Sequence, residues 1–212
     1  MATGTINASV GNGRAIKTDA TFATARGATD ADAAANDFLT IQTNNDGVGA
    51  EFNISRGFIP FGSTIPTGAT PTAGTIRVYV SSKDDETTGG AIGLIQTTQA
   101  SSGTIVVADY NNITLNTPDE GATRINIADL NTDAYNDFPL SATGLTWIIA
   151  GNNSSFFGMR HSRDIDNTQP GTATTSGKNR IVCNVTADAN PPQLTVTYDE
   201  IGARSGLQAK YW

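Results

Sequence analysis

The pattern of hydrophobic and polar positions is clearest in two successive segments near the middle of the chain. Between residues 52 and 61, apolar side chains occupy both odd and even positions. A strand that is apolar on both sides is covered on both sides, so this pattern predicts a central strand that ends near Pro60, which cannot donate a ladder hydrogen bond. Ile76, Val78 and Val80 alternate with polar residues, which predicts a half-buried strand. The Pro/Gly-rich segment between the two predicts a turn that makes them neighbours.

Shorter apolar runs, separated by turn residues, predict the rest of the fold. They cover residues 6–10, 38–43, 91–98, 105–110, 122–128, 155–160, 180–186 and 193–198. Residues 29–37 and 162–178 are interpreted as loops, and residues 145–149 have the spacing of one helical turn. Strands at these intervals without a long helix are typical of a sandwich or jelly roll. We therefore expect an all-β protein, an antiparallel β-sandwich of jelly-roll type.

The expected domain limits follow from the same pattern. The sandwich covers residues 41–199. Residues 1–40, which are weakly patterned and rich in Ala, Thr and Gly, are expected to form an extended N-terminal arm or a first strand. Residues 200–212 leave the pattern and are expected to form a C-terminal tail.

Charge and composition narrow the choice of partner. The net charge of -7 and the pI of about 4.5 argue against nucleic acid and against charge-driven binding to an anionic membrane. We expect neither a signal peptide nor a membrane span, because no charged-then-apolar segment opens the sequence. A single cysteine excludes an internal disulfide framework. Cys183 shares its parity with Ile181 and Val185, which predicts a core thiol.

Catalytic chemistry finds little support in the sequence. The one histidine, His161, stands beside Ser162 and Asp164, but the members of a catalytic triad usually meet across a fold and not along a short segment. We expect a surface histidine whose pKa is held down by two neighbouring arginines. No pair of acidic residues lies in a recognisable motif. The sequence therefore predicts a protein without a catalytic site.

Two other kinds of site remain open. The acidic segments 84–86 and 164–167 carry hard oxygen ligands that suit Ca²⁺, and solvated turns are the alternative; no other cofactor is expected. Exposed aromatic residues can stack on sugar rings. Tyr79, on the outward parity of its strand beside Arg77, is the best candidate for such a contact, with cross-strand packing as its alternative. Tyr110 is a weaker candidate, and Trp147 is expected in the core.

The end of the chain offers a third kind of contact. Tyr211 and Trp212 close an acidic sequence with two residue types that are preferred as interface anchors. We expect them either to dock on another subunit or to fold back onto the chain's own sandwich.

Several runs together resemble a jelly-roll domain that recurs in phage virion structural proteins and in large bacterial surface proteins, and that is similar to carbohydrate-binding modules. The resembling runs are residues 54–61, 65–66, 68–69, 73–80, 108–110, 135–145, 157–160 and 192–198. Their order and spacing are similar along nearly all of residues 50–199.

The resemblance implies a function as well as a fold. It implies a non-enzymatic virion protein, a capsid decoration (cement) protein that binds the major capsid protein or other virion proteins as a homo-oligomer, with a trimer favoured. Its location would then be the virion. The alternative is a carbohydrate- or receptor-binding module of a tail or head fibre, so a glycan remains a candidate ligand. A polysaccharide-degrading enzyme is the third hypothesis.

Overall fold

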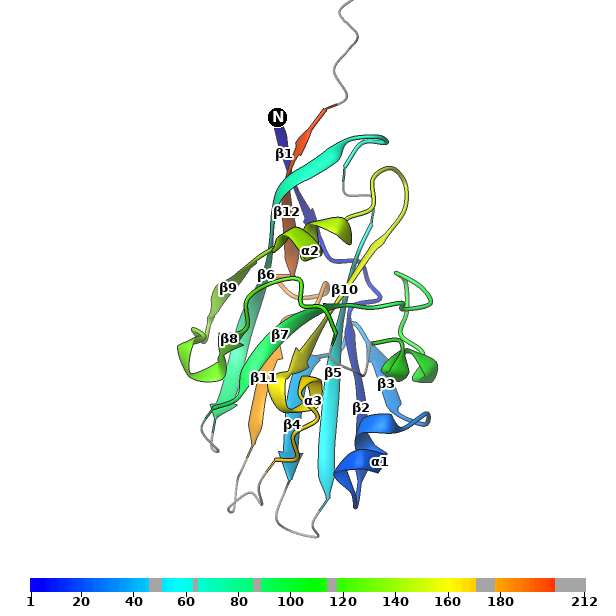
Figure 1. Cartoon of the computed structure of the whole chain (residues 1–212), viewed down its shortest axis with the longest axis vertical. Helices are drawn as coiled ribbons and strands as arrows, with labels where there is room; N and C mark the ends of the chain where they lie inside the picture. Colours follow the sequence, from blue (N-terminus) through cyan, green and yellow to red (C-terminus); the bar gives the residue numbers. More distant parts are fainter. Residues whose placement is uncertain (46–50, 63–64, 86–88, 114–117, 171–177, 201–212) are drawn as a thin grey trace, which may run out of the picture.

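The computed structural model describes residues 1–45, 51–62, 65–85, 89–113, 118–170 and 178–200, and the protein it shows is all-β. In these residues the strands join one antiparallel sheet that curls on itself (Figure 1). The strands are β1 (Ala2–Asn7), β2 (Gly13–Asp19), β3 (Asp32–Ala35), β4 (Leu39–Asn45), β5 (Phe52–Phe61), β6 (Thr70–Asp85), β7 (Ala91–Gln96), β8 (Ile125–Asn126), β9 (Ala134–Pro139), β10 (Ser155–His161), β11 (Asn179–Cys183) and β12 (Gln193–Asp199). Three short helices accompany them in the described residues: α1 (Phe22–Gly27), α2 (Ala142–Thr146) and α3 (Ser162–Ile165).

The order of strands across the sheet differs from their order along the chain. The main path is β1-β12-β6-β11-β4-β5-β10-β7-β8. Off this path, β2 pairs with β5, β3 pairs with β2, and β9 pairs with β6. The prediction that the two central strands, β5 and β6, are neighbours is therefore wrong. β11 and β4 lie between them, because β6 uses its edges for β12, β11 and β9.

β5 is the central strand that the sequence predicts. It pairs with β2, β4 and β10 and is buried along nearly its whole length. Its even-numbered apolar residues, such as Phe58, join one hydrophobic cluster, and Ile59 and Phe61 join another. The carbonyl oxygen of Pro60 accepts a hydrogen bond from Ser9 at 2.7 Å. The nitrogen of Pro60, which carries no hydrogen, faces the same side as this carbonyl. Regular pairing of β5 with β2 ends at Phe58, so no ladder hydrogen bond is lost at Pro60.

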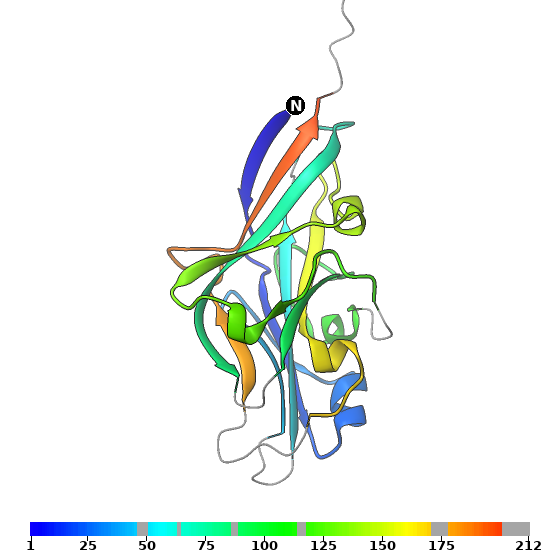
Figure 2. The ribbon, with the colours of Figure 1, turned by 60° about the vertical axis from the view of Figure 1, so that its left-hand side comes forward.

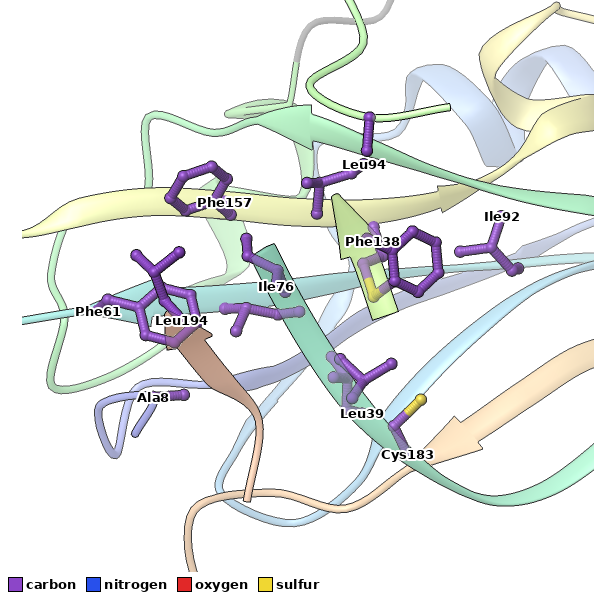
Figure 3. Close-up of a cluster of buried hydrophobic side chains, with 14 of the residues drawn as sticks. Ala8, Leu39, Phe61, Ile76, Ile92, Leu94, Phe138, Phe157, Cys183 and Leu194 are labelled. Atoms are coloured by element: carbon purple, nitrogen blue, oxygen red, sulfur yellow. The ribbon is translucent and has the colours of Figure 1, made fainter. Parts of the chain in front are cut away.

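The core lies between the layers of the curled sheet, and its members come from most of the strands (Figure 3). Phe61, Phe157 and Trp147 pack with ring centroids about 6 Å apart, and all three are buried. Cys183 lies in the same cluster, and burial raises the pKa of its thiol. The expectations of a core cysteine and a core Trp147 are confirmed.

Residues 1–40, expected as an arm or a first strand, contribute three strands and α1 to the structure. β1 pairs with β12, β2 pairs with β5, and β3 pairs with β2. Thr21 caps α1 by accepting a hydrogen bond from the N–H of Thr24. Phe22 and Ala25 of this helix enter the second hydrophobic cluster, against β5. β3 forms inside residues 29–37, where we expected a loop.

Local hydrogen bonds change two of the expected runs. A 3-10 helix, η1 (Val107–Asn111), forms where residues 105–110 were expected to be a strand. The carboxylate of Asp109 accepts hydrogen bonds from the N–H groups of Val106 and Ala100, both at 2.9 Å. Such bonds compete with a sheet ladder. Of residues 122–128, only β8 is a strand, and a second 3-10 helix, η2 (Ile127–Asp129), follows it. The helical turn predicted at 145–149 forms slightly earlier, as α2.

Candidate functional site

The solvent-facing side of β1, β12, β6 and β9 is the candidate functional surface, and we call it the outer face. β1 and β12 lie beside the upper part of β6 in the upper half of Figures 1 and 2, and β9 lies on the other side of β6, nearer the middle of the molecule. Ile76, Val78, Val80 and Leu194 of β6 and β12 are fully buried. The alternation of a strand then turns the residues between them outward, among them Arg77 and Tyr79.

The register of the four strands arranges the outer face in rows. One row runs Asn7, Gln193, Arg77, Asp137, and on one side of it lies a row of Thr5, Thr195 and Thr75. On the other side Tyr79 lies opposite Tyr135. The rows are internally bonded: Gln193 Nε2 donates to Asn7 Oδ1 at 3.2 Å, and the Thr5 and Thr195 hydroxyls are 3.0 Å apart.

Arg77 and Tyr135 form the centre of this surface. The guanidinium Nε of Arg77 donates to Asp137 Oδ1 at 2.9 Å, and its Cζ lies 4.7 Å from the centroid of the Tyr135 ring. Tyr79 packs edge-on against the same ring, with centroids 5.5 Å apart. The Tyr135 hydroxyl donates to the carbonyl oxygen of Pro191 at 3.1 Å. Burial raises the pKa of Tyr135, so this ring stays a neutral hydrogen-bond donor.

The outer face carries side chains of the kinds that bind partners. Guanidinium, carboxylate, amide and hydroxyl groups alternate with tyrosine rings, a mixture found on protein interfaces and on sugar-binding surfaces. Arg77 and Asp137 keep 39% and 52% of their side-chain surface exposed, so both still reach a partner. The cross-strand packing given as the alternative for Tyr79 is present, and it fixes the ring in place.

Several strongly perturbed ionisable groups lie inside the protein, in a cluster around Asp164. Arg56 Nε and Arg160 Nε both donate to Asp164 Oδ2, at 2.8 and 2.7 Å, and Arg26 Nε donates to the Asp164 carbonyl oxygen at 2.8 Å. Arg56 also stacks on Tyr110, with Cζ 4.0 Å from the ring centroid. Arg56, Arg160 and Tyr110 are completely buried. The cluster therefore connects α1, β5, η1, β10 and α3.

The charges of this cluster stabilise one another. Burial alone would raise the pKa of Asp164, but the charges and hydrogen bonds of Arg56 and Arg160 outweigh it and hold that pKa below its usual range. Burial raises the pKa of Tyr110, whose hydroxyl donates to the carbonyl oxygen of Ala25 at 2.7 Å. Asp164 therefore stays ionised and Tyr110 stays neutral at ordinary pH, and solvent does not reach either side chain.

The prediction of a surface histidine is wrong, because His161 is completely buried at the end of β10. Its Nδ1 accepts a hydrogen bond from Arg163 N–H at 3.1 Å and caps α3. Burial, together with the charge of Arg163, lowers the pKa of His161 to about 4. The imidazole is therefore neutral, with its proton on Nε2, which has no hydrogen-bond partner among the described residues. Nε2 lies where a side chain on Gly90 would otherwise sit.

Most carboxylates of the acidic segments considered for calcium are engaged with arginines, whereas Asp85 Oδ1 is buried without a hydrogen-bond partner among the described residues. Both carboxylate oxygens of Asp166 accept from Arg124 at 2.6 Å, and Asp84 Oδ2 accepts from Arg180 at 2.6 Å. Asp164 is held by Arg56 and Arg160, and Glu86 lies outside the described residues. Within the described part of the chain, no cluster of three or more His, Cys, Asp or Glu side chains has a geometry that suits a metal. The calcium hypothesis is left without a ligand set there.

A shallow hollow of about 630 Å³ lies apart from the outer face. Its lining consists of Ala100, Ser101, Ser102, Ile149, Asn152, Asn153, Ser154 and Phe156. None of these side chains titrates near neutral pH, so the hollow offers hydrogen bonds and an aromatic ring but no acid or base. Tyr211 and Trp212, the other expected contacts, lie outside the described residues.

No family model and no curated protein matches the sequence. In the described residues no helix is long and apolar enough to cross a membrane.

Sequence reasoning missed the buried cluster, although a signal for it exists. Arg56 shares its parity with Phe52, Ile54 and Phe58, which face a hydrophobic cluster. An arginine at such a position requires a buried anionic partner, because an unpaired charge is too costly to bury. The identity of that partner, Asp164, depends on the tertiary fold and could not be read from the chain.

Proposed function

We propose that the protein is a non-enzymatic structural component of a phage particle, a decoration or cement protein with a jelly-roll sandwich as its body. It would stabilise the head by binding the major capsid protein, or other virion proteins, as a homo-oligomer. Its chemistry would be that of surface contact, with neither a cofactor nor a reaction.

The resemblance to virion jelly rolls supports the part of the proposal that concerns the fold of the domain. Five of the resembling runs coincide with strands that build the core: residues 54–61 lie in β5, 73–80 in β6, 135–139 in β9, 157–160 in β10 and 193–198 in β12. The antiparallel, curled sheet agrees with such a fold. We propose that this curled sheet is a jelly-roll sandwich.

The observation that carries the functional part is the distribution of ionisable groups. Asp164, His161 and Tyr110 have strongly shifted pKa values, and all three are buried and paired or packed. Arg124, whose pKa is raised, is partly exposed but is held by Glu120 and Asp166. Catalytic acids and bases need perturbed pKa values and access to a substrate together. The surface instead presents the ordered polar rows of the outer face. Ordered polar surfaces on a rigid support suit contacts with large partners, which bury roughly 1,600 Å² in a standard interface.

The test is binding to heads of the phage that encodes the chain, after the decoration protein has been removed from them. We expect the purified protein to bind such heads, and a double variant, Arg77→Ala with Tyr79→Ala, to bind at least tenfold more weakly. Asp30→Asn is the matched control, because it removes an exposed ion pair with Lys17 on β2, away from the outer face. Failure of the intact protein to bind would contradict the proposal.

A carbohydrate- or receptor-binding module is the second candidate, and the composition of the outer face favours it. The row of amide, guanidinium and carboxylate groups beside Tyr79 and Tyr135 has the donors, acceptors and rings that sugar recognition uses. A glycan array tests this directly. We expect signals that Tyr79→Ala removes and that Thr197→Val, a change outside these rows on the same face, leaves intact. An array without signal for the intact protein would exclude glycans of the kinds it displays.

A further inference from the structure

Strands at the rim of the sheet differ in how they are protected from pairing with another chain. In the described part of the chain, β1, β3, β8 and β9 each pair on one side only. β8 has two residues, β3 begins with Asp32, and β9 contains Asp137 and Pro139. Short strands, charges and prolines all discourage edge pairing.

β1 has none of these devices. Its six residues, Ala2–Asn7, include no charge and no proline, and its register with β12 runs without a bulge. Figure 2 shows β1 at the rim beside β12, with no strand on its other side. Such an edge is a ready template for a further strand.

The backbone groups on the free side of β1 can be identified from the ladder. Directly after the strand, Ala8 N–H donates to the carbonyl oxygen of Pro192 on the β12 side at 2.8 Å. The hydroxyls of Thr3 and Thr5 lie 3.2 and 3.0 Å from those of the threonines opposite them on β12, as in the closer, non-hydrogen-bonded pairs of an antiparallel ladder. The N–H and C=O groups of Thr3, Thr5 and Asn7 therefore point to the free side.

We propose that this edge joins two copies of the chain, with β1 of each copy antiparallel to β1 of the other around a two-fold axis at Gly4. The residues around Gly4 read Thr-Gly-Thr, so the axis places Thr3 opposite the partner's Thr5 and Ala2 opposite the partner's Ile6. The free N–H and C=O groups of Thr3 then pair with those of the partner's Thr5.

Side chains also fit this register. The threonine hydroxyl rungs that connect β12 to β1 continue across both β1 strands, and no like charges meet in the paired segments. Gly4 leaves the axis uncrowded, since no heavy atom lies within 4 Å of the place where its side chain would start. A contact of this kind uses the same edge on both copies and closes with two. The inference does not depend on the proposed function, and it gives a dimer in place of the trimer that the resemblance implies.

The experiment measures the mass of the intact protein in solution by sedimentation equilibrium up to millimolar concentration. We expect a reversible species of twice the 22.0 kDa chain mass. Thr5→Pro removes an N–H from the free side of β1 and leaves the bonds to β12, so it should weaken association at least tenfold. Thr5→Val keeps the backbone donor and serves as the matched control, with association within about threefold of the unchanged chain.

A second measurement does not depend on the proline variant being folded. Gly4→Cys brings two thiols together at the axis, where closely spaced pairs suit a disulfide, and mild oxidation should give a covalent dimer. Thr197→Cys, one strand away on β12, should not cross-link. A chain that stays monomeric, a trimer, or a dimer that survives in folded Thr5→Pro would overturn the proposal. A dimer that Gly4→Cys fails to cross-link would overturn the axis at Gly4.

Discussion

Arg56, Arg160 and Asp164 are as deeply buried as the isoleucines and phenylalanines of the second hydrophobic cluster. A buried ion pair adds little when compared with a hydrophobic replacement, but the loss of one partner leaves the other charge unpaired in the interior. Here one carboxylate serves two fully buried guanidinium groups, with a third arginine on its backbone carbonyl. The stability of the fold should therefore depend strongly on this single aspartate.

Replacing Asp164 with Asn tests this dependence. Because the change leaves two buried arginines without a counter-charge, we expect it to lower the free energy of unfolding by about 3 kcal/mol or more. Urea unfolding of both proteins measures the difference. Asp30→Asn removes an exposed ion pair and should leave the unfolding midpoint unchanged. Equal effects of the two substitutions would show that the buried cluster contributes no more to the free energy of unfolding than an exposed ion pair does.

His161 predicts a particular dependence of stability on pH. Its pKa is about 4 in the folded protein, mainly because of burial, whereas an unfolded chain takes up this proton near pH 6.5. Above about pH 6.5 both states are neutral at this residue and it contributes nothing. As the pH is lowered from about 6.5 to about 4, the unfolded state takes up a proton that the folded state does not. The free energy of unfolding therefore falls by about 1.4 kcal/mol for each pH unit of acidification.

Urea unfolding across that pH range measures the slope. His161→Asn is the control, because an Asn side chain can accept the hydrogen bond that caps α3 but does not titrate. The variant should lose most of the slope, whatever its stability at neutral pH. An unchanged slope would mean that carboxyl groups cause the dependence.

At the scale of elements, close approaches between segments depend on glycine. Gly57 in the central strand β5 leaves room for the side chains of Leu39 and Ile41 from β4. Gly144 of α2 lies directly against the backbone carbonyl of Gly121, and Gly121 in turn lies against the ring of Trp147. These contacts hold α2 and the segment before β8 against the core.

Gly144→Ala should therefore destabilise the protein. The new methyl group would overlap the carbonyl oxygen of Gly121, a backbone atom that cannot move aside without moving the chain segment before β8. We expect a loss of about 1–3 kcal/mol, as for other overpacked sites. Gly27→Ala, at the end of α1, is the control because no atom lies within 4 Å of the added carbon. Thermal unfolding compares the two, and equal midpoints would contradict this close packing.

The elements also show which parts of a fold a single sequence reveals. The burial of β5 on both sides and the alternation of β6 were predicted correctly. Large apolar residues occupy both faces of β5 and every second position of β6 between residues 76 and 80, so the sequence alone shows which faces are buried. The strands of residues 1–40 carry mainly Ala, Thr and Gly, so their burial depends on what they pair with. Pairing itself is a long-range property, and for that reason the predicted contact between β5 and β6 was wrong.

The candidate site shows the same limit. Parity alone placed Arg77 and Tyr79 on the outward side of β6. Their neighbours Asp137 and Tyr135 come from β9, some 60 residues further along the chain, and the register of that strand brings them opposite. Sequence patterns give the direction in which a side chain points, whereas the surface that it joins depends on the sheet.

At the scale of the whole molecule, buried charges fix the interior and ordered polar rows cover one exposed face. The free edge of β1 lies next to that face, so the outer face borders the proposed contact between copies (Figures 1 and 2). This arrangement suits a rigid component whose function is to bind neighbours. We propose that those neighbours are the proteins of a phage particle.

Quantitative mass spectrometry of density-purified particles of the encoding phage is the sharpest test of this proposal. We expect the chain to be present at a fixed ratio to the major shell protein, of the same order of abundance, and we expect the ratio to persist through repeated purification. Abundant chain in the lysate together with its absence from the particles would rule the proposal out.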